Sequence, residues 1–294
     1  MFYRRKIILA LIQLLGGELE KLRIQKLLFL YSQKKKNPEY EFIPYKFGCY
    51  SFSANADLVT MVKNGSLSEN ECFFIKDSSE DYLKTLKVED KKIIQEVVQL
   101  YGSMDRNQLI KHTYINFPYY AINSTIAEKV LDNVQINKVN SLKVKLKESI
   151  LYTIGYEGVS LEKYLNKLVQ NQIKLLVDVR KNPLSMKFGF SKTLLKKYCE
   201  SLGIEYIHIP EVGIDSNQRQ ELNTQEDYDA LFDVYKKTTL EVTLSYQEKI
   251  ITLLEKYNRI ALTCFEAEIC QCHRKPLSES IKSNPKFNYE LKHI

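Results

Sequence analysis

The sequence predicts an α/β protein with two domains, in which a Rossmann-like, three-layer domain with a parallel sheet follows a mostly helical, winged-helix-like domain. Its 294 residues are enough for two domains of roughly 150 residues each. From residue 150 onward, short apolar runs alternate with amphipathic segments, a pattern typical of βαβ units with right-handed crossovers. The lysine-rich segment 134–149 is predicted to be a linker between domains at residues 1–133 and 150–294.

The composition is that of an ordinary globular protein, with 44% hydrophobic and 27% charged residues. No run of about 18 apolar residues occurs, so we expect no membrane span and a cytoplasmic location. The basic and apolar start of the chain lacks a small-residue cleavage site, which favours a first helix over a signal peptide. The six cysteines do not form the pattern of a disulfide framework, and Cys49, Cys72 and Cys199 are expected to be buried thiols.

In the N-terminal domain, helical apolar stripes are interrupted by short extended segments. Helices are predicted at residues 5–15, 22–35, 83–101 and 105–114, and a further helix is predicted to begin with Ser53 as its cap. Segments 40–48 and 72–76 are predicted to be extended. This order of elements is typical of a winged helix or a close variant.

The N-terminal half also carries most of the positive charge. Residues 1–150 hold 23 Lys and Arg against 17 Asp and Glu, whereas residues 151–294 hold 20 against 19. This excess makes nucleic acid a candidate partner of the first domain. The side chains predicted to contact phosphates are Arg23, Lys26, Lys34, Lys35, Lys36 and Lys63. A solvated basic face without a nucleic-acid partner is the alternative.

Three motifs in this half resemble those of a known module. They are Leu-Arg-Ile-Gln-Lys-Leu-Leu at 22–28, Pro-Tyr-Lys-Phe-Gly at 44–48, and Leu-Ile-Lys-His-Thr-Tyr at 109–114 followed by Pro118 and Tyr119. With them, residues 1–125 resemble the antitoxin-type module called Panacea or SocA-like. The resemblance implies a regulator or interaction module with a protein partner, as in toxin–antitoxin or phage-defence systems.

The second domain is predicted to consist of alternating strands and helices. Strands are expected at residues 151–154, 175–178, 205–209 and 260–263, and helices at 160–170, 191–201, 228–237, 240–257 and from Pro276 onward. In a parallel sheet the carboxyl ends of all strands lie on one edge, where ligands bind. Polar or special residues follow each of these strands, so we expect a single cleft there.

That cleft collects the residues from which we expect chemistry. Proton transfer and nucleophilic attack are expected of Asp178, Glu157, Glu266, Cys264 and His273. Substrate contacts are expected from Arg180, Arg274, Gly155, Tyr156, Ser185 and His208, with the two arginines holding phosphate. The alternatives are a structural ion pair between Asp178 and Arg180, and a Cys264 thiol that only packs at the end of a buried strand.

No metal or other cofactor is predicted. Cys264, Cys270, Cys272 and His273 offer ligand types suited to zinc, but Cys-x-Cys-His lacks the usual Cys-x₂₋₄-Cys spacing. Zinc at this loop is therefore the weaker alternative. An anion pocket formed by His273 and Arg274 at the start of the final helix is preferred.

The motifs of the second domain also resemble those of a known family. In order, they are Thr-Ile-Gly-Tyr-Glu at 153–157, Val-Asp-Val-Arg at 177–180, Gly-Ile at 203–204 before His208, and Cys-Phe-Glu at 264–266 with Cys-His-Arg at 272–274. With them, residues 150–283 resemble the family catalogued as domain of unknown function 488 (DUF488). The resemblance implies a fold and a site but no reaction. Such proteins commonly have an arginine where this chain has Met186, and Lys187 is the residue that could substitute for it.

From these features we expect a nucleic-acid- or nucleotide-associated protein whose α/β domain is a hydrolase or transferase for a phosphate-containing substrate. Two alternatives stay open. One is a DNA-binding regulator whose α/β domain senses a nucleotide-like ligand. The other is an interaction module of a defence or toxin–antitoxin system.

Overall fold

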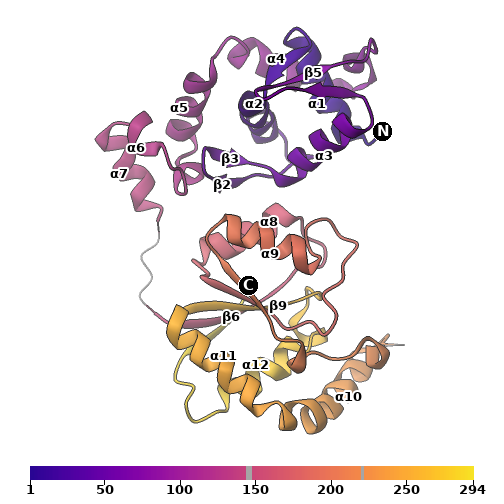
Figure 1. Cartoon of the computed structure of the whole chain (residues 1–294), viewed down its shortest axis with the longest axis vertical. Helices are drawn as coiled ribbons and strands as arrows, with labels where there is room; N and C mark the ends of the chain where they lie inside the picture. The colour runs from indigo at the N-terminus through magenta and orange to yellow at the C-terminus, as the bar shows by residue number, and fades with distance from the viewer. Residues whose placement is uncertain (144–147, 220–221) are drawn as a thin grey trace. The chain divides into compact units, whose positions relative to one another are not determined.

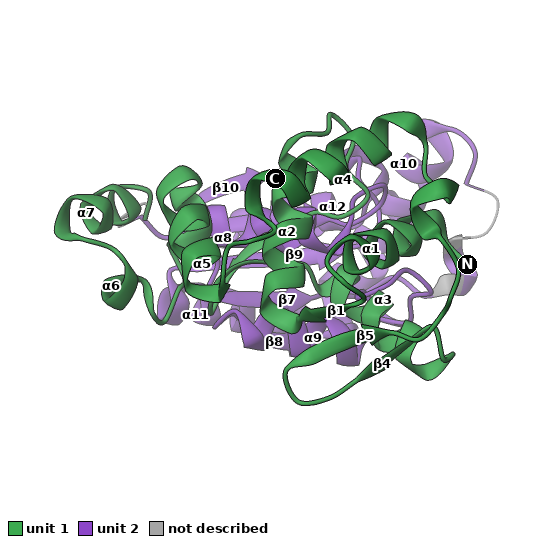
Figure 2. Cartoon of the chain, turned by 90° about the horizontal axis from the view of Figure 1, so that it is seen from above, with its two compact units in different colours: residues 1–143 green, residues 144–294 purple. Residues whose placement is uncertain are grey.

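The structure of the protein, a computed structural model, describes residues 1–143, 148–219 and 222–294. The chain forms two compact units, residues 1–143 (unit 1) and residues 144–294 (unit 2), which Figure 2 shows in different colours. The predicted fold class is confirmed, because unit 1 is mostly helical and unit 2 contains a five-stranded parallel sheet. None of the helices in the described ranges combines the length and apolar character needed to cross a membrane.

Unit 1 is built around α1, in which all residues from 7 to 12 are completely buried. A helix that is apolar on all sides is typical of a core position. Strands β1, β5 and β4 form an antiparallel sheet in that order, and β2 pairs with β3 in a separate hairpin. The elements are α1 (Tyr3–Leu14), β1 (Glu18–Glu20), α2 (Lys21–Gln33), β2 (Ile43–Tyr45), β3 (Gly48–Tyr50), α3 (Phe52–Lys63), β4 (Leu67–Glu69), β5 (Phe73–Lys76), η1 (Tyr82–Thr85), α4 (Val88–Tyr101), α5 (Arg106–Asn116), η2 (Pro118–Ala121), α6 (Ala127–Val130) and α7 (Asn133–Ser141).

Three details of unit 1 differ from the sequence-based expectations. The cap of α3 is Ser51 and not Ser53, because the Ser51 Oγ accepts the Ala54 N–H at 3.2 Å. Cys72 is exposed, since it lies in the turn between β4 and β5. The segment expected to be a linker begins with α7, which buries Val139 in a small apolar cluster. Residues 144–147 of that segment lie outside the described residues.

Unit 2 is a three-layer α/β/α arrangement. Its five strands are all parallel, in the order β10-β6-β9-β7-β8. Figure 1 shows α8 and α9 on one face of the sheet and α11 and α12 on the other. The elements are β6 (Ile150–Gly155), α8 (Leu161–Gln170), β7 (Leu175–Asp178), α9 (Lys192–Ser201), β8 (Glu205–His208), η3 (Pro210–Val212), η4 (Ser216–Arg219), α10 (Gln225–Tyr235), the π-helical turn η5 (Lys236–Leu240), α11 (Leu244–Tyr257), β9 (Arg259–Cys264), η6 (Ile269–Gln271), α12 (Arg274–Lys282) and β10 (Glu290–His293).

The central strands of unit 2 are covered on both faces. Every residue of β7 and β9 is buried, which explains why these strands are recognisable as short continuous apolar runs. Strand β10 was not predicted, because it is a largely exposed edge strand with the polar sequence Glu-Leu-Lys-His. The most deeply buried part of the sheet is therefore the part whose carboxyl ends carry the candidate residues.

Candidate active site at the carboxyl edge of the sheet

The carboxyl ends of four strands lie level at one edge of the sheet in unit 2. Strand pairing places Gly155 of β6 beside Cys264 of β9. It also places Asp178 of β7 beside Thr263 of β9 on one side and beside His208 of β8 on the other. The loops that follow these strands carry the candidate residues of the second domain.

Asp178 is completely buried and holds Arg180 in a two-pronged ion pair. Asp178 Oδ1 accepts from Arg180 Nε at 2.8 Å, and Oδ2 accepts from Arg180 Nη2 at 2.5 Å. The Tyr206 hydroxyl donates to the same Oδ2 at 2.5 Å. Arg180 Nη1 donates to the Tyr156 hydroxyl at 2.7 Å and to the Phe190 carbonyl at 2.9 Å. Asp178 therefore serves as the counter-ion of Arg180, and it has no exposed surface through which to act as a base on a substrate.

Electrostatics keeps this cluster charged. Burial works against the charge of Arg180, but the hydrogen bonds and negative charge of Asp178 hold the pKa of Arg180 above its ordinary value. Burial and the neighbouring Asp178 carboxylate raise the pKa of Tyr206 as well, so the phenol stays neutral and keeps donating. The arrangement is that of the structural ion pair considered as an alternative.

Cys264, Glu266 and His273 come together next to this pair. Cys264 Sγ lies 3.2 Å from Glu266 Oε2 and 3.5 Å from His273 Nδ1. His273 Nε2 lies 3.1 Å from the Val179 carbonyl oxygen. A carbonyl can only accept, so Nε2 carries a proton, and Nδ1 is the ring nitrogen that faces the thiol. Cys264 and His273 are buried, whereas Glu266 is half-buried.

Arg274 points into the protein and away from solvent, with 1% of its surface exposed. Its Nε donates to Cys272 Sγ at 3.0 Å, and its Nη2 donates to the Glu266 carbonyl oxygen at 2.5 Å. Burial and the adjacent Cys264 raise the pKa of the Cys272 thiol, against the lowering effect of Arg274. Since His273 is also completely buried, the expectation of an open anion pocket formed by His273 and Arg274 is wrong.

The loop after β6 holds the loop after β9 in place. A Cβ atom at Gly155 would lie 1.9 Å from the Glu266 carbonyl oxygen, so the close approach of the two loops requires glycine there. The Glu157 N–H donates to the Phe265 carbonyl at 2.8 Å, and the Glu157 carboxylate accepts the Ala267 N–H at 3.0 Å. Glu157 is exposed, but its carboxylate holds the loop after β9 through this hydrogen bond.

A pocket of about 230 Å³ opens at this edge of the sheet. Lys181, Asn182 and Ser185 give it a polar rim, and Cys264 gives it a reactive group in the wall. Sequence reasoning missed Lys181, although it directly follows the Val-Asp-Val-Arg motif. The full lining is Tyr156, Arg180, Lys181, Asn182, Leu184, Ser185, Ile214, Cys264 and Phe265.

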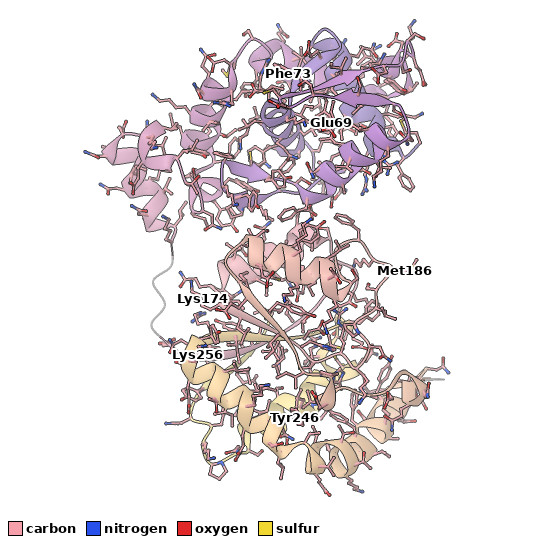
Figure 3. All side chains as sticks on the ribbon, viewed as in Figure 1. Glu69, Phe73, Lys174, Met186, Tyr246 and Lys256 are labelled. Carbon is pink, nitrogen blue, oxygen red and sulfur yellow. The ribbon has the colours of Figure 1, made fainter. Side chains whose placement is uncertain are left out.

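Three other residues of this region are not among those that line the pocket. His208 Nε2 donates to the Arg180 carbonyl at 2.8 Å, and its Nδ1 lies 3.1 Å from Lys192 Nζ, so both ring nitrogens are engaged. Met186 is fully exposed and projects from the loop between β7 and α9 (Figure 3). Lys187 Nζ donates to the Tyr156 carbonyl at 2.7 Å, and burial lowers the pKa of Lys187. Lys187 therefore supports the loop and does not point outward in the place of an arginine.

The predicted phosphate contacts of unit 1 are only partly available. Lys26 is 1% exposed, its Nζ donates to the Phe47 and Cys49 carbonyls, and burial lowers its pKa. Its prediction as a phosphate contact is wrong, because nucleic acid cannot reach it. Lys36 and Lys63 are exposed. Three of the cations have partners inside unit 1, with Arg23 donating to the Gly102 carbonyl, Lys34 pairing with Glu96, and Lys35 pairing with Glu39 and Asp90.

The family described as Domain of unknown function DUF488 matches residues 160–281, which lie within unit 2. The match contains the Val-Asp-Val-Arg, Cys-Phe-Glu and Cys-His-Arg motifs, and it supports the resemblance of the second domain to this family. No curated protein matches the chain. The antitoxin-like resemblance of the N-terminal half stays a prediction.

Proposed function

We propose that unit 2 is an enzyme, a hydrolase or transferase, that acts on a phosphate-containing substrate of the nucleotide or nucleic-acid class. The observation that carries the proposal is the pocket at the carboxyl edge of the sheet, where a cationic and polar rim faces a thiol with acid–base partners. Pockets that combine donors for an anion with ionisable groups are typical of active sites.

The rim supports an anionic substrate. Lys181 supplies a positive charge, while Asn182 and Ser185 supply neutral hydrogen-bond donors. The pocket is smaller than the roughly 300–1,000 Å³ typical of sites for drug-sized ligands. We therefore propose that it holds the phosphate-bearing end of a substrate and not a whole dinucleotide.

The wall supports chemistry. The lone pair of His273 Nδ1 lies at 3.5 Å from Cys264 Sγ, so in the unliganded protein it can accept the thiol proton and leave a thiolate beside an imidazolium. Glu266 is the half-buried member of the group and lines a neighbouring cavity of about 140 Å³ and not the pocket itself. Its carboxylate lies 3.2 Å from Cys264 Sγ and can take the thiol proton. Asp178 and Arg180 position the loop that carries the rim.

Turnover of a panel of nucleotides and short oligonucleotides tests this proposal. Lys181→Ala is expected to raise KM, because it removes the rim charge, and Cys264→Ser is expected to reduce kcat by at least about 100-fold. Lys174→Ala is the matched control, since this exposed lysine lies just before β7, at the opposite end of the strand from the pocket (Figure 3). Full activity of Cys264→Ser, or equal KM values for Lys181→Ala and Lys174→Ala, would contradict the proposal.

A second function is favoured by one observation in unit 1. We propose that unit 1 binds nucleic acid as a winged helix. A β2–β3 hairpin lies between α2 and α3, but the other elements follow the order α1, β1, α2, α3, β4, β5 with the sheet order β1-β5-β4, which is typical of winged-helix domains. In such domains the third helix enters the groove, and α3 ends in the exposed Lys63.

The charge available for this binding is small. Of the six predicted cations, Lys36 and Lys63 are the exposed ones without an ion pair described above. Two phosphate contacts correspond to a slope of about −1.8 in a plot of log affinity against log salt concentration. Electrophoretic mobility shift at several salt concentrations measures this slope. Binding that is absent at low salt, or unaffected by Lys36→Glu with Lys63→Glu, would exclude a nucleic-acid role for this surface.

A further inference from the structure

The most concentrated set of metal-ligating atoms in the described residues lies in one short segment after β9. Cys264, Glu266, Cys272 and His273 each present one ligand atom, and these four atoms all lie within 4.8 Å of one another. We propose that they bind one divalent transition-metal ion of the zinc class. This goes beyond the proposed function, because it concerns the cofactor of the site and stands whether or not the substrate carries phosphate. With an ion bound, Cys264 and His273 would serve as ligands, and the ion would take the part that the thiol and the imidazole play in the metal-free protein.

The spacing of the four atoms suits a tetrahedral ion. Zinc–sulfur bonds of about 2.3 Å and zinc–nitrogen bonds of about 2.0–2.1 Å place sulfur and nitrogen about 3.5 Å apart on a tetrahedron. Cys264 Sγ and His273 Nδ1 are 3.5 Å apart, and Cys264 Sγ and Glu266 Oε2 are 3.2 Å apart. An ion at the centre fits these two distances, and it requires any more widely spaced pair of the four atoms, which lie within 4.8 Å of one another, to move closer together.

The surroundings of His273 also suit metal binding. A histidine ligand almost always donates its second ring N–H to a carbonyl or carboxylate, which directs the other nitrogen at the metal. His273 Nε2 meets the Val179 carbonyl at 3.1 Å, and this bond directs Nδ1 at the cluster. The tautomer that a metal ligand needs is already selected by the fold.

The charges of the cluster balance when an ion is bound. Arg274 is buried, and its side chain donates to Cys272 Sγ at 3.0 Å and to the Glu266 backbone carbonyl. Neither of these two acceptors is a carboxylate. Two thiolates and the Glu266 carboxylate would carry three negative charges, which the two charges of the ion and the charge of Arg274 neutralise. A bound ion thus gives the buried guanidinium a thiolate counter-charge.

This ligand set differs from the zinc alternative drawn from the sequence. Cys270 lies in the turn η6 and is only half-buried, and it is not part of the cluster. Glu266 takes its place. Because the other three ligands are buried and Glu266 is half-buried, the carboxylate is the ligand that a water or substrate oxygen can displace. Three fixed ligands and one exchangeable position are typical of catalytic zinc sites, where the ion acts as a Lewis acid.

Metal analysis of the full chain tests the inference. The protein is purified under reducing conditions, stripped with a chelator, reloaded with zinc or cobalt(II), and freed of unbound metal by gel filtration. We expect about one ion per chain, and a cobalt spectrum with thiolate charge-transfer bands and the visible bands of a tetrahedral ion. Cys264→Ser and Cys272→Ser are expected to weaken binding by at least about tenfold. Cys270→Ser, the matched control in the same loop, is expected to bind metal like the wild type.

Circular dichroism checks that each variant is folded. Glu266→Gln changes only one half-buried side chain and is expected to give a cobalt spectrum that differs from that of the wild type in its visible bands. A reloaded wild type without bound metal, or equal metal contents in Cys270→Ser and Cys272→Ser, would overturn the inference. Failure of the proposed function can be distinguished from failure of the metal inference. Turnover by a protein that retains no metal after reloading would support the reaction and reject the ion, whereas bound metal without turnover of any substrate would support the ion and reject the reaction.

Discussion

Two buried arginines lie at the same edge of the sheet, and they differ in what neutralises them. Arg180 faces a carboxylate, with both Asp178 oxygens accepting from its guanidinium. Arg274 donates instead to the Cys272 sulfur and to the Glu266 backbone oxygen. The first cluster is electrically complete within the fold, whereas the second becomes complete when its sulfur atoms carry negative charge.

This difference separates a structural role from a functional one. A buried ion pair with full hydrogen bonding stabilises its loop and offers nothing to a ligand. A buried cation beside two thiols and an imidazole has groups that change their protonation when a ligand or metal binds. The chemistry of unit 2 is therefore expected at Cys264, Cys272 and His273 and not at Asp178, although the sequence makes both clusters candidates.

The prediction with the largest expected effect concerns the ion pair between Asp178 and Arg180. Asp178→Ala leaves Arg180 buried without its counter-ion and is expected to lower the free energy of unfolding of unit 2 by about 3–5 kcal/mol. Urea unfolding of the full chain measures this loss. The control is Asp233→Ala, which removes an exposed pair with Lys236 and is expected to cost less than about 1 kcal/mol. A stable Asp178→Ala protein that lost only turnover would reverse the assignment of the two clusters.

Glycine substitutions compare the two clusters directly. A Cβ at Gly155 would lie 1.9 Å from the Glu266 carbonyl oxygen, and a Cβ at Gly213 would lie 2.4 Å from the Lys181 backbone nitrogen. Both Gly→Ala changes are expected to cost about 1–3 kcal/mol through overpacking. Only Gly155→Ala moves the loop that carries the proposed metal ligands, so it alone is expected to change the cobalt spectrum. Identical spectra for the two variants would count against a site in that loop.

Removing the charge of Arg274 is expected to matter more for metal than for folding. Arg274→Met keeps a long apolar side chain but removes the donors to Cys272 Sγ and the Glu266 carbonyl. We expect zinc affinity to fall by about 10-fold or more, because partners of the ligands tune the ion. Competition with a chromogenic chelator measures the affinity. Unchanged affinity would mean that Arg274, like Arg180, is only a structural residue.

The smallest effect concerns the hydroxyl that completes the Asp178 cluster. Tyr206→Phe removes one donor to Asp178 Oδ2 and is expected to cost about 1.5 kcal/mol at pH 7. Burial, followed by the neighbouring Asp178, raises the pKa of Tyr206 above its ordinary value of 10.0. A raised pKa contributes stability that is present below pH 10 and is lost as the pH rises further. The stability difference between wild type and Tyr206→Phe should therefore shrink above about pH 10, and a constant difference would contradict this origin.

Much of unit 2 could be predicted because its central strands are buried on both faces. The apolar runs that become β6, β7 and β9 are visible in the sequence, and the rule that parallel strands end on one edge brings Asp178, Cys264 and His208 together. Strand β10 could not be predicted in the same way, because an exposed edge strand with polar residues has no apolar signal.

What the sequence could not predict is which charged groups satisfy one another. Lys26 has the same charge as Lys36, but it is buried against backbone carbonyls, and only tertiary packing decides this. Tyr206 reaches Asp178 across neighbouring strands, a pairing that depends on register. The Cys-x-Cys-His spacing suggested a ligand set containing Cys270, whereas the turn at residues 269–271 leaves that thiol outside the cluster.

All four proposed donors belong to residues 264–273, a single stretch between one strand and one helix. The entropy lost in closing a loop grows with its length, so a contact between ends this close along the chain costs little to form. The centre can thus assemble as soon as β9 and α12 are in place, before distant parts of the sheet have joined. An ion captured at that moment would act as a nucleus for the folding of unit 2.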